Sequence, residues 1–212
     1  MLKTIDRILV LAPHTDDGEF GCGGTIAKFV DAGKDIYYAA FSTAEESVPS
    51  NWPKDILKTE VKEATKRLGI KPDNVLIYNF QVRKLSYFRQ EILEELVKLK
   101  RSLNPDLVIL PSPNDLHQDH LTIANEGLRA FKDNSILGYE IPWNNIKFQT
   151  ESFIILSEEN IKTKIYALDA YDSQKGKAYA NADFIKSLAR TRGVQIGAPF
   201  AEAFEVIRWI IK

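Results

Sequence analysis

The sequence predicts an α/β fold of three layers, α/β/α, built on a mostly parallel sheet. Apolar runs of strand length alternate with segments whose apolar residues recur at helical spacing. Some of these runs are apolar at every position, which is typical of strands buried on both faces. No linker divides the 212 residues, so we predict a single domain over residues 1–212.

The first strand is predicted at residues 8–12, where a continuous apolar run ends at Pro13. After a glycine-rich turn, residues 25–32 have helical spacing and stop at Gly33, a residue type common just past a helix end. Residues 36–41 (IYYAAF) are rich in β-formers and give the second strand.

The same alternation continues to residue 131. Residues 54–68 and 89–103 carry apolar residues at helical spacing and are predicted as helices, with a third strand between them at 75–78. The fourth strand and fourth helix are predicted at 107–110 and 120–131.

The last third of the chain is less regular. We predict strands at 138–141 and 153–156, helices at 161–171 and 181–192, and either a strand or a helix at 204–211. In a sheet of order 3-2-1-4 the first and fourth strands are neighbours. Ligands bind such sheets in the crevice beyond the carboxyl ends of those two strands.

Composition narrows the classes of function. Lys plus Arg number 28 and Asp plus Glu 29, and this net charge of −1 argues against a nucleic-acid partner. Cys22 is the only cysteine, which suits a reducing compartment. With no targeting segment and no run of ~20 apolar residues, we expect a cytoplasmic protein without a transmembrane segment. A homo-oligomer stays open, because the apolar segment 206–211 suits either a core or an interface.

Chemically reactive side chains gather after the first and fourth strands. Residues 13–24 read PHTDDGEFGCGG, and residues 111–120 read PSPNDLHQDH. These segments contain all three histidines of the chain, His14, His117 and His120. Two imidazoles and a carboxylate form a strong site for a divalent metal that keeps positions open for water. The joint placement therefore predicts a metal site, although one histidine alone would as readily be a packed residue.

Alternatives remain within residues 13–24. Asp16 and Asp17 are adjacent, so one can bind metal while the other faces a substrate; otherwise the pair caps the next helix. Residues 21–24 do not fit G-x-G-x-x-G, the pattern of dinucleotide-binding loops, which disfavours a nucleotide-binding oxidoreductase or transferase. We expect instead that the backbone of these glycines packs closely against a neighbouring element as the chain turns into a helix. Cys22 has no basic neighbour in the sequence, so we expect a packed thiol.

Both motifs resemble those of a known family. Residues 13–24 resemble the His-Pro-Asp-Asp-Glu motif of the PIG-L/LmbE-like zinc-dependent N-acetylglucosaminyl deacetylases, and residues 115–120 resemble their Asp-x-His-x-Asp-His motif. Weaker similarity at 60–69, 164–174 and 192–204 extends over nearly the whole chain. The resemblance implies a Rossmann-like fold and a hydrolase that removes N-acetyl groups from small amino sugars or N-acetylglucosamine-containing glycoconjugates, releasing acetate.

The resemblance also implies a role for each motif residue. It makes His14, Asp17 and His120 the ligands of Zn²⁺ and Asp16 the general base, and it implies no further cofactor. His117 would stabilise the oxyanion and protonate the leaving amine, while Asp119 would orient a histidine. The ligand set also suits iron or cobalt, so another divalent metal stays open.

The chain departs from the family pattern at several positions. The usual proline is Thr15, and the glutamate that follows the two aspartates in many relatives is Gly18, with Glu19 one place later. An arginine that relatives often carry is replaced by Leu57-Lys58. The alternative function is therefore a catalytically silent sugar-binding relative.

Residues that would contact the rest of the substrate are less well specified. An anionic group of the substrate could be bound by Arg83, Lys84, Arg190 or Arg192. Trp52 and Trp143 could stack on a sugar. Tyr139 and Glu140 could line the pocket. For each arginine, lysine and tryptophan, a solvated surface or ordinary packing is the competing interpretation.

Overall fold

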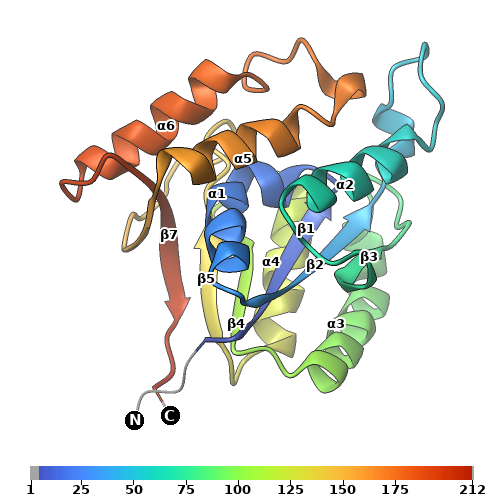
Figure 1. The fold of residues 1–212 in the computed structure, drawn as a ribbon. Helices are drawn as coiled ribbons and strands as arrows, with labels where there is room; N and C mark the ends of the chain where they lie inside the picture. The colour runs from blue at the N-terminus through green and yellow to red at the C-terminus, as the bar shows by residue number, and fades with distance from the viewer. Residues whose placement is uncertain (1–4, 212) are drawn as a thin grey trace.

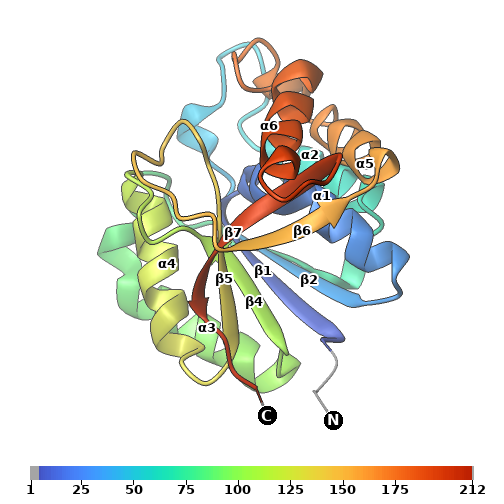
Figure 2. The same ribbon diagram turned by 90° about the vertical axis from the view of Figure 1, so that its left-hand side faces the viewer.

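The computed structural model describes residues 5–211, and a seven-stranded sheet runs through its centre in the order β3-β2-β1-β4-β5-β7-β6 (Figures 1 and 2). Strands β1 to β5 are parallel, and β7 runs antiparallel between β5 and β6. The mostly parallel sheet and the order 3-2-1-4 are confirmed. The strands are β1 (Arg7–His14), β2 (Asp35–Ser42), β3 (Val75–Ile77), β4 (Leu107–Pro111), β5 (Ser135–Tyr139), β6 (Ser152–Leu156) and β7 (Phe200–Arg208).

Helices cover both faces of the sheet, as predicted. In β1, Ile8 and Val10 pack into the core beneath α1, α2 and α5, whereas Leu9 and Leu11 pack into the core beneath α3 and α4. This alternation follows from the two-residue period of a strand. The helices are α1 (Asp17–Asp31), α2 (Ile56–Arg67), α3 (Arg89–Leu103), α4 (Gln118–Ala130), α5 (Glu158–Leu168) and α6 (Ala182–Val194), the last packed on β7.

Helix α1 begins eight residues earlier than predicted. It starts at Asp17 and is broken by non-helical angles at Cys22 (φ −147°, ψ 24°). Glycine is a weak helix former, which hid this start in the sequence. The glycines are needed for packing: a Cβ added to Gly18 would lie 2.5 Å from the Tyr38 ring, and one on Gly24 would lie 2.5 Å from the side chain of Leu156. The expected close approach of this segment is confirmed.

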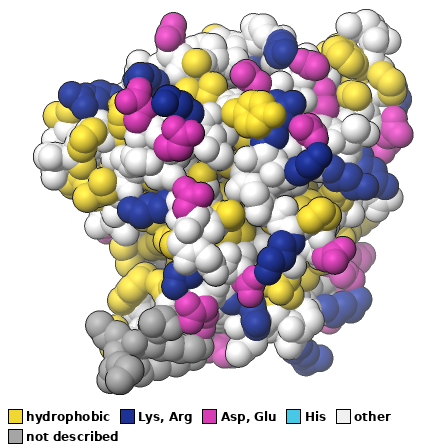
Figure 3. Space-filling model, in the orientation of Figure 1, with side chains coloured by type: hydrophobic (Ala, Val, Ile, Leu, Met, Phe, Trp, Pro, Cys, Tyr) yellow, Lys and Arg dark blue, Asp and Glu magenta, His cyan; other side chains and the backbone are white. Residues whose placement is uncertain are grey.

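The last third resolves the open choice at residues 204–211. Those residues belong largely to strand β7, which extends the sheet. Helix α5 starts three residues earlier than predicted, because Ser157 and Asn160 form a reciprocal capping box at its N-terminus. None of the helices within residues 5–211 is both long and apolar enough to cross a bilayer. On the face drawn in Figure 3, basic and acidic side chains are interspersed.

Candidate metal centre

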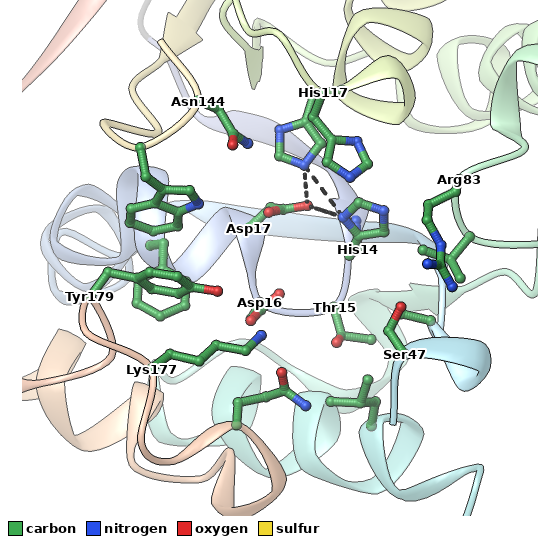
Figure 4. Close-up of a pocket in the computed structure, with 17 residues that line it drawn as sticks. His14, Thr15, Asp16, Asp17, Ser47, Arg83, His117, Asn144, Lys177 and Tyr179 are labelled. Atoms are coloured by element: carbon green, nitrogen blue, oxygen red, sulfur yellow. Dashed lines mark hydrogen bonds and ion pairs between the residues drawn. The ribbon is translucent and has the colours of Figure 1, made fainter. Parts of the chain in front are cut away.

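The two motif-bearing segments meet at one end of the sheet. β1 and β4 are parallel neighbours, so their carboxyl ends lie side by side. His14 is the last residue of β1, while His117 caps the N-terminus of α4 and His120 lies in its first turn, just after β4. The ring centroids of these histidines lie 4.7–5.2 Å apart. The structure therefore brings all three together (Figure 4).

Three donor atoms form a triangle of the size that a small divalent ion requires. Asp17 Oδ2 lies 3.1 Å from His14 Nδ1 and 3.2 Å from His120 Nε2, and the two nitrogens are 3.3 Å apart. Tetrahedral coordination with bonds of 2.0–2.1 Å separates ligand atoms by roughly 3.3 Å. A zinc-sized ion thus fits this donor set.

Buried carboxylates orient both histidines of the triangle. Asp119 Oδ2 lies 2.9 Å from His14 Nε2, and Asp115 Oδ2 lies 2.7 Å from His120 Nδ1. Each of these contacts assigns a proton to the outer ring nitrogen, which leaves the lone pair of the inner nitrogen directed at the triangle. Asp115 was not singled out from the sequence, although its place at the start of the second motif was a usable signal.

The electrostatics of the cluster favour a bound positive charge. Burial lowers the pKa of His14, but Asp17 and Asp119 outweigh it and raise that pKa to about 9. In the same way, burial lowers the pKa of His120, but Asp17 and Asp115 outweigh it and raise that pKa to about 10. Burial raises the pKa of Asp17, yet the two histidines hold it well below its usual range. The negative charge around both rings favours protons on them, and a divalent cation placed in the triangle would compete with those protons.

His117 differs from the other two histidines. Its Nδ1 accepts a hydrogen bond from the backbone N–H of Asp119 at 3.2 Å, which caps α4. A neutral ring in this arrangement carries its proton on Nε2. Burial, together with His14 and His120, lowers the pKa of His117 and so favours that neutral form. One nitrogen from each histidine nevertheless lies within 4.8 Å of the others, so a three-histidine set is geometrically available.

Asp16 lies beside the triangle and presents its carboxylate to the pocket. It occupies the N-cap position of α1, but its side chain makes no capping hydrogen bond. Burial and the charge of Asp17 raise its pKa, whereas Lys177 and His14 lower it. In Figure 4 the Lys177 ammonium points toward Asp16. The two adjacent aspartates therefore have different surroundings, as their divergence predicted, and helix capping does not account for Asp16.

A cavity of about 200 Å³ opens beside these residues and continues toward the last third of the chain. The ring of Trp143 stacks on Tyr179 with centroids 3.8 Å apart, and Phe20 contacts both edge-on. The lining residues that the sequence did not flag are Phe20, Ala44, Ser47, Val82, Asn144, Gln174, Lys177 and Tyr179. Phe20 lies within residues 13–24 and Gln174 ends the weakly similar stretch 164–174, whereas the other six lie in no motif.

The candidates for substrate contact divide into two groups. Arg83 and Trp143 line the cavity. Trp52 instead packs against the core, and Arg190 donates a hydrogen bond to the Pro199 carbonyl. Lys84 is exposed and is not among the lining residues. Arg192 forms an ion pair with Glu140. Tyr139 is fully buried, and its hydroxyl donates a hydrogen bond to the Leu11 carbonyl. Arg192, Glu140 and Tyr139 do not line the cavity, so their expected contact with a substrate is not met.

Glu19 lies behind the site. It is fully buried, and its carboxyl group contacts the hydroxyls of Tyr38 and Tyr171. Burial raises its pKa to about 8. Gly18 lies against Tyr38, which leaves no space for a larger residue there. The departure from the family pattern at these two positions therefore concerns packing behind the pocket.

Cys22 is a buried free thiol whose pKa burial raises, in line with the expected packed thiol.

Comparison with known proteins gives a consistent picture. Residues 9–131 match the model of the PIG-L family, described as GlcNAc-PI de-N-acetylase. The diacetylchitobiose deacetylase of Thermococcus kodakarensis is 30% identical over 134 residues, covering 59% of this chain and 49% of that protein. The protein YaiS of Escherichia coli K12, named an uncharacterized deacetylase, is 28% identical over 172 residues, covering 78% of this chain and 90% of that protein. The chain thus spans about half the length of the Thermococcus relative.

Solved structures share the fold. The conserved protein TT1542 from Thermus thermophilus superposes with a TM-score of 0.80 at 24% identity, covering 98% of both chains. N,N'-diacetylchitobiose deacetylase from Pyrococcus horikoshii superposes with a TM-score of 0.74 at 24% identity, covering 95% of this chain and 84% of that one. At these identities the likeness establishes the arrangement of helices and strands.

Proposed function

The chain belongs to the PIG-L (GlcNAc-PI de-N-acetylase) family, and on that premise we propose that it is a zinc-dependent hydrolase. The reaction is removal of the N-acetyl group from an N-acetylglucosamine-containing glycoconjugate or a related amino sugar. Water is consumed, and the products are the free amine and acetate. The proposal includes one domain over residues 1–212, a cytoplasmic location and a small-molecule substrate.

The observation that carries the proposal is the triangle of donor atoms from His14, Asp17 and His120, each 3.1–3.3 Å from the next. Its size suits zinc, and the carboxylates of Asp115 and Asp119 hold the two imidazoles in the ligating tautomer. Iron or cobalt would accept the same donors.

We assign the third ligand position to Asp17, and His117 to a different role. The Nδ1 lone pair of His117 already accepts the N–H of Asp119. Its Nε2 carries the proton when the ring is neutral and so has no lone pair for a metal. Asp17, by contrast, has an oxygen that faces both ligating nitrogens.

His14, Asp17 and His120 would hold the zinc ion, which when bound would supply a water molecule of lowered pKa and would polarise the acetyl carbonyl. Asp16 takes a proton from the attacking water, because its carboxylate faces the pocket and burial raises its pKa, which makes the carboxylate more basic. The same proton then passes to the departing nitrogen, so that the amine leaves neutral. His117 donates its Nε2–H to the oxygen that gains negative charge. Because its lowered pKa favours the neutral ring, we assign the protonation of the leaving amine, which the resemblance gave to His117, to Asp16 instead. Asp119 is a positioning residue, since it acts through His14.

The test is metal content and acetate release measured on wild type and on His120→Ala, purified side by side. We expect about one zinc per wild-type chain, its loss from the variant, and acetate release from N-acetyl-D-glucosamine or N,N'-diacetylchitobiose by the wild type alone. A wild-type protein that binds no metal after zinc is added back would overturn the proposal. Bound zinc without turnover of any N-acetylated amino sugar would favour the silent sugar-binding alternative.

A further inference from the structure

Thr15 carries a buried polar atom without a partner. The residue is 1% exposed, and its hydroxyl makes no hydrogen bond within residues 5–211. It lies between His14 and Asp16 in the chain and lines the cavity. In Figure 4 its side chain points into the part of the cavity that lies away from the histidines. Buried hydroxyls in folded proteins almost always have a partner, so this one is available to a water molecule or to a ligand in the cavity.

The backbone of Thr15 is held firmly. Its carbonyl accepts hydrogen bonds from the hydroxyls of Tyr38 at 2.9 Å and Tyr171 at 2.7 Å. Both tyrosines are buried and also contact the carboxyl group of Glu19. Threonine is branched at Cβ, which limits its χ1 rotamers. The direction of the hydroxyl is therefore largely fixed, and its oxygen lies just behind the surface of the cavity that Thr15 lines.

A second threonine shows which feature matters. Thr25 in α1 is also fully buried with an unpartnered hydroxyl. It does not line the cavity, so no ligand there can reach its hydroxyl. An unpartnered hydroxyl alone is therefore not a binding group; the position of Thr15 in the cavity, next to the proposed base Asp16, makes the difference.

The surroundings of Thr15 suit a sugar ring. The cavity lining includes the apolar side chain of Leu57 and the polar side chains of Ser47 and Gln174. A pyranose presents both C–H groups and hydroxyls, and therefore matches a mixed lining of this kind. A sugar hydroxyl can pair with the threonine hydroxyl in either direction, because it can donate to the threonine oxygen or accept from its proton.

We propose that the Thr15 hydroxyl forms a hydrogen bond with a hydroxyl group of the sugar ring that bears the acetamide, and that it helps to set the specificity of the site for that sugar. This inference rests on the function proposed above. Proline, the residue that the family motif has at this position, cannot make the contact, so the contact would be particular to chains with a hydroxyl here.

The test compares Thr15→Val with Thr15→Ser and Thr25→Val. Valine keeps the shape and removes the hydroxyl, and we expect kcat/KM for N-acetyl-D-glucosamine to fall roughly 10-fold, mainly through KM. Thr15→Ser restores the hydroxyl and recovers most of the loss. Thr25→Val removes the matched hydroxyl outside the cavity and leaves kcat/KM unchanged. Equal kcat/KM for Thr15→Val and wild type would overturn the inference.

Deoxy substrates separate a direct contact from a general disturbance of the site. Each enzyme is assayed with the 3-deoxy, 4-deoxy and 6-deoxy analogues of N-acetyl-D-glucosamine. On the analogue that lacks the contacted hydroxyl, wild type and Thr15→Val become equal, because the lost partner is already absent. If the valine variant loses the same factor on every analogue, Thr15 has a structural role only and the inference is wrong.

Failure of the proposed function can be told apart from failure of this inference. If the wild type releases no acetate from these sugars, D-glucosamine is titrated into zinc-loaded wild type and Thr15→Val by calorimetry. A dissociation constant roughly 10-fold weaker for the valine variant supports the contact without any turnover. Equal binding by the two proteins, or no binding by the wild type, overturns it.

Discussion

The two walls of the pocket are built differently. The histidine wall, made of His14, Asp16, Asp17, His117 and His120, lies at the ends of two central strands, and its rings are held by buried carboxylates. The C-terminal wall, made of Trp143, Gln174, Lys177 and Tyr179, consists of loop and short-turn residues. There Lys177 is exposed and Trp143 is 39% exposed.

In the proposed function, the difference between the walls separates residues for chemistry from residues for specificity. Metal chemistry needs donor atoms fixed within a few tenths of an ångström, which buried strand ends and a second layer of carboxylates provide. Contacts to the rest of a substrate tolerate more freedom and can be supplied by loops on a rigid scaffold. If so, substitutions in the histidine wall should have large effects, and substitutions in the C-terminal wall small ones.

The largest effect is expected at Asp16. Asp16→Ala removes the proposed base, and we expect kcat/KM to fall about 10²- to 10⁴-fold. Zinc content should stay at the wild-type level, because Asp16 is not part of the donor triangle. Acetate release and elemental mass spectrometry on the same preparations measure the two quantities. Full activity in the variant would exclude Asp16 as the base.

His117 tests whether the histidine wall divides into ligands and a donor. His117→Asn keeps a residue that caps helices well at the start of α4 and removes the ring N–H. We expect a fall in kcat of roughly 10²- to 10³-fold with zinc retained. Loss of zinc together with activity would instead favour the three-histidine ligand set.

Asp119 tests whether the carboxylates behind the histidine wall support metal binding. Its carboxylate contacts His14 Nε2 and also accepts the backbone N–H groups of Arg83 and Leu85. Asp119→Asn removes the charge, and we expect zinc affinity to weaken about 10- to 100-fold in competition with a chelator. The exposed Asp55→Asn variant, which changes no cavity residue, serves as the control. Unchanged zinc affinity would mean that Asp119 serves only the loop.

The histidine wall could be predicted because its residues lie close together in the sequence. Strand ends are marked by apolar runs that stop at proline, and the His and Asp residues follow within a few positions. The order of the first four strands then brings both motifs together. The start of α1 was missed because its glycines are chosen for contact with Tyr38 and Leu156, a tertiary requirement that helical propensity does not record.

The C-terminal wall could not be predicted in the same way. Lys177 and Tyr179 lie more than 150 residues from Asp16 and reach the pocket through the loop that follows α5. That loop is anchored by Glu60, whose carboxylate accepts the backbone N–H and the hydroxyl of Ser173. A contact of this kind depends on packing between distant elements and leaves no periodic pattern in the sequence.

The smallest effect is expected at Lys177, and its direction is the informative part. Its charge lowers the pKa of Asp16, so Lys177→Met should raise that pKa. A base with a higher pKa is protonated over more of the acidic range, so the acid limb of the kcat/KM profile should move to higher pH. The loss of kcat/KM should therefore be greater at pH 6 than at pH 8. It should stay below about 10-fold, because the Lys177 side chain is exposed and its charge is screened.

Lys175→Met is the control. Lys175 lies in the same loop but is paired with Asp172 and lies outside the cavity, so its variant should leave the pH profile in place. A shift toward lower pH, or the same shift in both variants, would show that the C-terminal wall does not act on the proposed base through charge.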